Sequence, residues 1–134
     1  PQWVVAKPDA EQLGALQSFV QSDDRRFGAL RRQLQWGAAR TVQQPQGART
    51  TVVVPGRVVR DPDAFYGAQR HHVFVRGSSG YAYMGEVPGK PDGYVDIDGN
   101  DLPGLVVSEG CDGWCVSLWG LTGGLRQVAR FGGH

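Results

Sequence analysis

Residues 71–87 read HHVFVRGSSGYAYMGEV, in which two runs of β-branched and aromatic residues flank a short Ser-Ser-Gly segment. Such runs favour strands, and a short connection that contains glycine favours a hairpin between them. Tyr81 and Tyr83 are two positions apart, so on a strand they share one face. The stretch therefore predicts an antiparallel hairpin, but a hairpin alone does not explain its serines and tyrosines.

Alternation with a period of two continues on both sides of this stretch. TTVVV (50–54), Pro55-Gly56 and RVVRD (57–61) predict another hairpin before it. Further short strands are expected at 93–97, 104–109, 114–121 and 125–131. The chain's 20 glycines and 8 prolines supply turns between them.

The first third of the chain has the period of a helix instead. Apolar residues recur three or four positions apart after Pro8-Asp9, and again after Asp23-Asp24, where either aspartate can cap a second helix. The two apolar stripes are Leu13, Leu16, Phe19 and Val20, and Phe27, Leu30 and Leu34. We therefore expect a helical hairpin within residues 1–42, followed by a linker at 43–49.

These patterns predict a mainly β (α+β) protein that forms one domain over residues 1–134. The helical part (1–42) would pack on an antiparallel β part (50–131), which is a sheet, a sandwich or a small barrel. The helices also carry arginines away from their apolar stripes. With no aromatic residues between them, these are more typical of a solvated helix surface than of a basic binding face: Arg25, Arg26, Arg31 and Arg32.

Charge is unevenly distributed along the 134 residues, whose net charge is only +1. Residues 1–60 have nine basic and four acidic side chains, and seven of the later acids lie within 86–112, where Lys90 is the one basic residue. That acidic region favours a cation or a basic partner over nucleic acid. Neither a membrane-length apolar run nor a signal peptide follows Pro1, so we expect a cytosolic protein or one whose leader has been removed.

The two cysteines, Cys111 and Cys115, lie in the sequence CDGWC. In an extended chain their Cα atoms would be about 13 Å apart, but the intervening Asp-Gly can form a turn that brings them within disulfide range. A local disulfide, and hence an oxidising compartment, is the preferred interpretation. Two buried thiols are the alternative.

Residues 94–107, YVDIDGNDLPGLVV, alternate oxygen-bearing side chains in the order D-x-D-x-N. Asp96, Asp98 and Asn100 can converge on a hard cation such as calcium, with Asp101, Asp92, a backbone carbonyl and water completing the shell. The stretch resembles the calcium loops of FG-GAP and integrin-type repeats, although Gly104 replaces an acid that those loops usually carry. The alternative is an Asp/Asn/Gly turn in which the carboxylates cap backbone amides.

Ser79-Gly80-Tyr81-Ala82-Tyr83 fits S-G-x-x-Y, and this motif resembles that of the bacterial envelope inhibitors of lysozyme. A related group, inhibitor-like immunity lipoproteins, is similar over residues 71–121, since S-G-x-x-Y is followed by the D-x-D-x-N loop, a hydrophobic strand and tryptophans. The resemblance implies a periplasmic or outer-membrane-associated protein, with a lipid anchor on a longer precursor as one arrangement. It also implies that the loop plugs the cleft of a peptidoglycan hydrolase.

The implied partner-binding residues are Arg76, Ser78, Ser79, Gly80, Tyr81 and Tyr83. A lysozyme-type cleft presents two carboxyl groups around the glycosidic bond, and a serine hydroxyl and an arginine can bind such groups. Under this interpretation Ser79 enters the cleft, Gly80 permits the shape of the tip, Tyr83 braces it, and the protein is not an enzyme.

Two other classes of function remain open. His71 or His72 can act as the general base of a small secreted hydrolase or nuclease toxin, oriented by Glu86 or Asp63, although strand alternation places the two imidazoles on opposite faces. A calcium-stabilised carbohydrate-binding module can stack a sugar on Trp119 or Tyr81. The sequence leaves the oligomeric state open.

Overall fold

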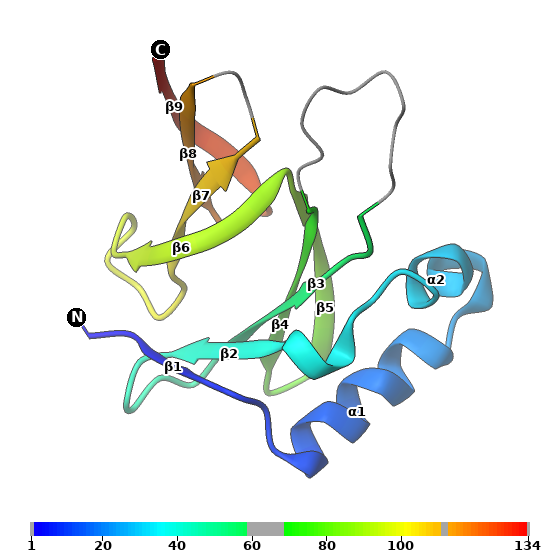
Figure 1. Cartoon of the computed structure of the whole chain (residues 1–134). Coiled ribbons are helices and arrows are strands. Elements are labelled where there is room, and N and C mark those ends of the chain that lie inside the picture. Colours follow the sequence, from blue (N-terminus) through cyan, green and yellow to red (C-terminus); the bar gives the residue numbers. More distant parts are fainter. Residues whose placement is uncertain (1, 59–68, 111–112, 134) are drawn as a thin grey trace.

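The computed structural model describes residues 2–58, 69–110 and 113–133. Their strands form two antiparallel sheets, each with its strands in sequence order (Figure 1). The first sheet contains β1 (Val4–Ala6), β2 (Arg40–Gln43), β3 (Thr50–Pro55), β4 (His71–Gly77) and β5 (Gly80–Val87). The second contains β6 (Gly89–Val95), β7 (Gly104–Glu109), β8 (Trp114–Gly120) and β9 (Arg126–Gly133). The mainly β, α+β prediction is confirmed as a sandwich-like arrangement, and the described strands close no barrel.

Two helices cover one face of the first sheet (Figure 1). Helix α1 (Ala10–Gln21) is capped by Asp9, whose carboxylate accepts from the Gln12 amide at 2.7 Å, while the Gln12 side chain accepts from the Asp9 amide at 2.9 Å. Helix α2 (Asp24–Arg31) is capped by Asp23. These caps satisfy amides that have no partner within the helix, and they confirm the predicted helical hairpin.

Strand β4 lies between two hydrophobic cores because its successive side chains point to opposite faces. Phe74 packs with the helices in a core of Leu16, Val20, Phe27, Leu34, Ala39, Val52 and Val54. Val73 and Val75 pack against the second sheet, in a core with Val87, Leu102, Leu105, Val107 and Leu121. A strand buried on both faces explains why HHVFV is so uniformly apolar around its histidines.

The part of the chain expected to be helical also contains two strands. Strands β1 and β2 lie before and after the helices in the sequence and pair with each other. It also corrects the hairpin expected at 50–61. Strand β3 pairs with β2 and β4, Arg57 and Val58 lie outside any strand, and residues 59–61 lie outside the described residues. Within the described part of the chain, no helix is long and apolar enough to cross a membrane.

Candidate functional site

The turn between β4 and β5 presents the predicted serines at its tip. Gly77 pairs with Gly80 across the hairpin, so Ser78 and Ser79 form the connection, and both are exposed. Gly80 has φ of +105°, with open space where a Cβ would be. This is the pattern of a type I turn followed by a glycine bulge, in which a larger residue at Gly80 would be strained.

The tip carries hydrogen-bond donors and a positive charge. Neither the Ser78 nor the Ser79 hydroxyl has a hydrogen-bond partner among the described residues. Arg76 is exposed at the end of β4, and its guanidinium carbon lies 5.7 Å from the centroid of the Tyr81 ring. That cation–π contact holds Arg76 beside the tip without neutralising it.

Tyr81 and Tyr83 point away from the tip toward the helices. The Tyr81 ring lies 6.1 Å from Phe19 and its hydroxyl donates to the Gln12 carbonyl at 3.3 Å. The Tyr83 ring lies 5.8 Å from Phe27 and 5.0 Å from Phe74. Burial raises the pKa of Tyr81, and it raises the pKa of Tyr83 to about 12. Both rings therefore fasten the hairpin to α1 and α2, and this contact orients the tip.

Two open grooves adjoin the tip. One, of about 700 Å³, includes Arg76 and Ser78, and the other, of about 340 Å³, includes Gly80; Arg49, Gly77 and Ser79 line both. The far wall of the second groove comes from residues of the acidic loop and of the turn after β8, namely Asn100, Leu102, Leu121, Thr122, Gly123 and Gly124. The hairpin tip thus stands between two hollows.

Arg49 connects the tip region to the predicted calcium loop. Its Nε donates to the Asp101 carboxylate at 2.7 Å, and Gln44 donates to the Asn100 carbonyl at 3.2 Å. The hydrogen bond and charge of Arg49 hold the pKa of Asp101 below its usual range. Sequence reasoning missed Arg49, since the two members of this ion pair are 52 positions apart and neither belongs to a shared motif.

The other side chains of the calcium loop have partners within the protein. Asp96 accepts from the Gly99 amide at 2.8 Å, and Asp98 pairs with Arg126 at 3.5 Å. Asn100 accepts from the Leu102 amide at 3.0 Å and donates to the Thr122 hydroxyl. The described residues contain no group of three His, Cys, Asp or Glu side chains placed to hold a metal. Calcium binding here stays a prediction.

His71 and His72 face different layers of the molecule, as strand alternation requires. His72 Nδ1 lies 3.0 Å from the Tyr83 hydroxyl on the helical side, and its Nε2 is buried without a partner. Burial lowers the pKa of His72 below its ordinary value, against the opposing effect of Glu86. Glu86 itself pairs with Arg70 at 2.9 Å, and Asp63, the other proposed orienting acid, lies outside the described residues.

The aromatic residues of β8 differ in exposure. Trp114 is 57% exposed, whereas Trp119 is half-buried against the second core and donates to the Ser117 hydroxyl at 2.7 Å. Trp119 therefore has a structural role like that of Tyr81, although part of each ring remains accessible. Cys115 lies on β8 and Cys111 lies outside the described residues, so the disulfide stays a prediction.

The comparisons with known proteins found no match that bears on this geometry. No family model, curated protein or solved structure matches the chain. A functional interpretation therefore depends on the tip, the grooves beside it and the contacts that hold them.

Proposed function

We propose that the protein binds and inhibits a peptidoglycan hydrolase of the lysozyme type by inserting the 76–83 hairpin into the enzyme's cleft. The observation that carries the proposal is the combination, at one exposed tip, of two serine hydroxyls without internal partners and an arginine without an acidic partner among the described residues. The protein would act by blocking the cleft, with no chemistry of its own.

The chemistry of the tip complements that of such a cleft. Glycosidases of this type place two carboxyl groups around the bond that they cleave. Ser78 and Ser79 can donate hydrogen bonds to them, and Arg76 can bind a carboxylate with two parallel N–H groups. The complementary charges would also speed association at low salt.

The packing behind the tip supports tight binding. Tyr81 and Tyr83 hold the hairpin against α1 and α2, so little conformational entropy remains to be lost when the tip enters a cleft. The grooves on either side of Ser79 leave space for the walls of the cleft. Such a role requires the protein to reach the cell wall, and we accordingly propose a periplasmic or outer-membrane-associated location.

A cell-wall lysis assay tests the proposal with a panel of lysozymes and lytic transglycosylases. We expect stoichiometric inhibition of at least one enzyme, abolished by Ser79→Trp and weakened about tenfold or more by Arg76→Gln, which loses hydrogen bonds to a charged group. Ser18→Trp is the matched control, because Ser18 is an exposed serine of α1 remote from the tip in sequence. Failure to slow any enzyme in the panel, or equal loss with Ser18→Trp, would contradict insertion of the tip.

Calcium binding by the 96–101 loop belongs to the same proposal as a support for the groove wall. It requires Asp98 and Asp101 to exchange Arg126 and Arg49 for the cation. A rise in melting temperature with calcium, absent in Asp98→Asn, would support this role. Identical melting temperatures in calcium and in chelator would contradict calcium binding. The loop would then be stabilised by its internal hydrogen bonds and ion pairs alone.

A further inference from the structure

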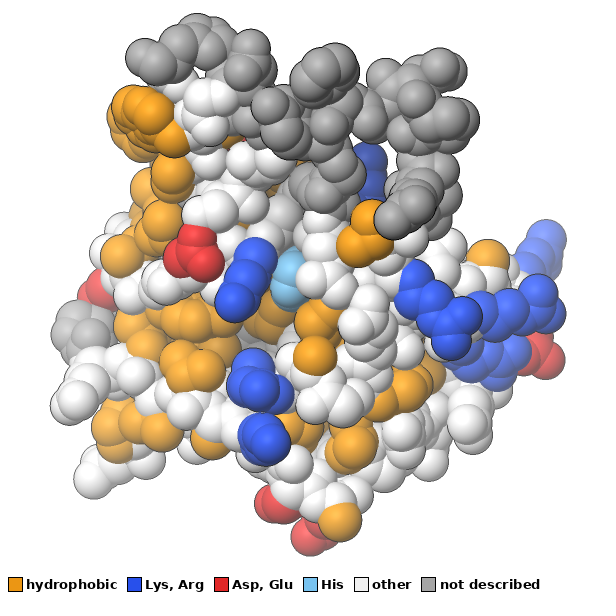
Figure 2. All heavy atoms as spheres, viewed as in Figure 1, with side chains coloured by type: hydrophobic (Ala, Val, Ile, Leu, Met, Phe, Trp, Pro, Cys, Tyr) orange, Lys and Arg blue, Asp and Glu red, His pale blue; other side chains and the backbone are white. Residues whose placement is uncertain are grey.

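A separate cavity lies between the two sheets, on the face of the first sheet that is turned away from the helices. Its volume is about 260 Å³, many times what one water molecule needs. It is lined by Ala38, Arg40, Val53, Pro55, Gln69, His71, Lys90, Pro91 and Tyr94. Figure 2 shows a histidine side chain at the surface with basic side chains beside it.

The described residues of the lining include basic side chains and no acid, although the carboxylate of Asp92, next to Pro91 on β6, acts electrostatically on His71 and Tyr94. Arg40 is half-buried, and one of its terminal nitrogens donates to the Ala39 carbonyl at 2.7 Å. This hydrogen bond fixes the guanidinium, whose other N–H groups can donate to a ligand. Lys90 is exposed at the rim on β6. Neither side chain forms an ion pair with any described residue. Two cations thus converge on a hollow whose described lining residues include no carboxylate.

The third basic group, His71, is held in place within the wall. The side chain is only 5% exposed, and its Nδ1 donates to the Gln69 carbonyl at 3.0 Å, since a carbonyl can only accept. Burial lowers the pKa of His71, backbone hydrogen bonds with Gln69 and Gly89 and the charge of Asp92 oppose that shift, and the positive charge of Lys90 adds to it. A bound anion would offset this positive potential and favour proton uptake by the imidazole.

The remaining walls suit the uncharged part of a small organic molecule. Val53, Pro55 and Pro91 supply apolar surface, and Tyr94 adds a ring. Burial raises the pKa of Tyr94 to about 12, so its phenol stays protonated and can donate a hydrogen bond. The cavity is slightly smaller than typical drug-sized pockets of about 300–1,000 Å³, which indicates a compact ligand.

We propose that this cavity binds a small organic anion whose carboxylate or phosphate group contacts Arg40 and Lys90 and whose apolar part lies against Pro91 and Tyr94. Both anionic groups offer the same recognition chemistry, namely oxygen acceptors for a guanidinium and an ammonium. The site uses none of the tip residues, so it is independent of hydrolase inhibition.

Titration of the ¹⁵N-labelled protein, followed by amide and imidazole NMR shifts, tests this site. The probes are benzoate, phenyl phosphate and inorganic phosphate, with benzyl alcohol as the neutral shape control. We expect saturable shifts around His71 with benzoate or phenyl phosphate, a higher pKa of His71 in the bound state, and no saturation with benzyl alcohol. Comparing the two organic anions distinguishes a carboxylate ligand from a phosphate ligand.

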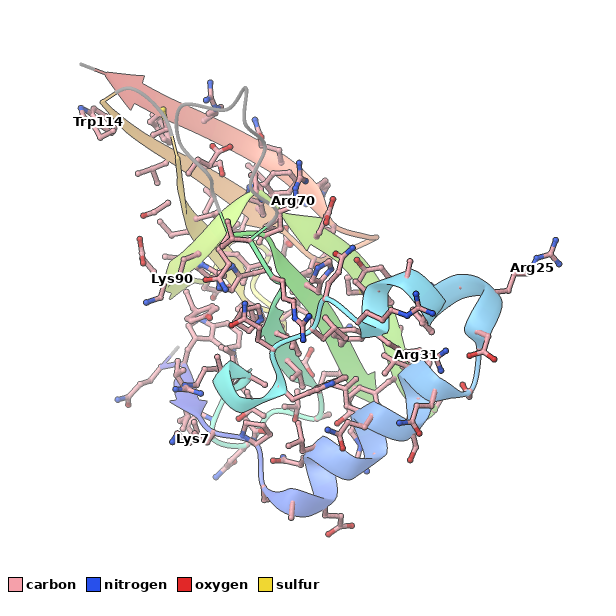
Figure 3. All side chains as sticks on the ribbon, turned by 45° about the vertical axis from the view of Figure 1, so that its right-hand side comes forward. Lys7, Arg25, Arg31, Arg70, Lys90 and Trp114 are labelled. Carbon is pink, nitrogen blue, oxygen red and sulfur yellow. The ribbon has the colours of Figure 1, made fainter. Side chains whose placement is uncertain are left out.

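Lys90→Gln and Arg25→Gln make the same change of charge at two distant places. Figure 3 shows Arg25 projecting into solvent from α2, far from Lys90 on β6. Lys90 is exposed, so its replacement should leave the fold intact, as unchanged NMR shifts elsewhere would verify. We expect Lys90→Gln to weaken benzoate or phenyl phosphate binding about tenfold or more and Arg25→Gln to have no effect. Absence of saturation at millimolar concentrations, or equal weakening by both variants, would overturn the proposal.

Discussion

The buried hydrogen bond between Tyr83 and His72 should contribute far more to stability than the corresponding bond of Tyr81. In Tyr83→Phe the ring and its packing on Phe27 and Phe74 remain, but His72 loses the partner of its Nδ1. His72 is 2% exposed and its Nε2 already has no partner, so both ring nitrogens would then be buried and unpaired. A buried unpaired group costs about 1–3 kcal/mol.

Tyr81→Phe is the matched control. Its hydroxyl makes a longer bond, 3.3 Å, to the carbonyl of Gln12, and both residues are half-buried, so water can replace the lost partner. We expect this variant to lose only about 0–1 kcal/mol. Urea unfolding measures the difference: for a typical slope of about 1–3 kcal/mol per M, Tyr83→Phe should lower the midpoint by about 1 M with the slope unchanged. Equal losses in the two variants would refute the buried-bond reasoning.

Two further predictions concern pH and the cysteines. Burial depresses the pKa of His71 and His72 below 6.5, so the unfolded chain binds protons first as pH falls. The free energy of unfolding should therefore decrease below about pH 6.5, by up to about 1.4 kcal/mol per pH unit for each histidine; equal urea midpoints at pH 7.5 and 5.5 would contradict this. Cys111 and Cys115 should form a disulfide, which would make the intact mass two hydrogens lighter than after reduction; equal masses would exclude it.

Local sequence patterns predicted the elements whose signals lie within a few residues. Strand β7 begins and ends at the residues expected, Gly104 and Glu109, because glycines mark off a strongly apolar run. The N-caps of α1 and α2 could also be predicted from the sequence, since an aspartate directly precedes each helix. In contrast, β1 and β2 have only three and four residues, too few for a visible period, and they are strands because each pairs with the other.

The error at β3 has a similar physical origin. Pro55-Gly56 was interpreted as a turn, yet Pro55 ends β3 opposite His71. The next residue, Gly56, packs closely against the His72 side chain of β4. A Cβ at this position would lie 2.9 Å from His72 Nε2. The glycine is thus required by a close approach in space, which sequence alone does not distinguish from a turn.

The candidate site was predictable only in its local part. S-G-x-x-Y indicated an exposed tip and tyrosines on one shared face, since both follow from neighbouring residues and from the period of a strand. That this face meets α1 and α2, and that Arg49 links the tip to Asp101, depends on segments far apart in the chain. The cavity at His71 was not foreseen either, because its basic residues come from three different strands.

Strand β4 contributes to both proposed sites, at its two ends. His71 lines the cavity and Arg76 flanks the tip, and the five steps along the strand between them place their Cα atoms about 16 Å apart. A small anion in the cavity therefore cannot reach a hydrolase bound at the tip, and the two proposals can fail separately. Protein saturated with benzoate should inhibit the hydrolase as well as free protein does. Loss of inhibition on saturation would mean that the buried core around Phe74 transmits a change between the ends of β4.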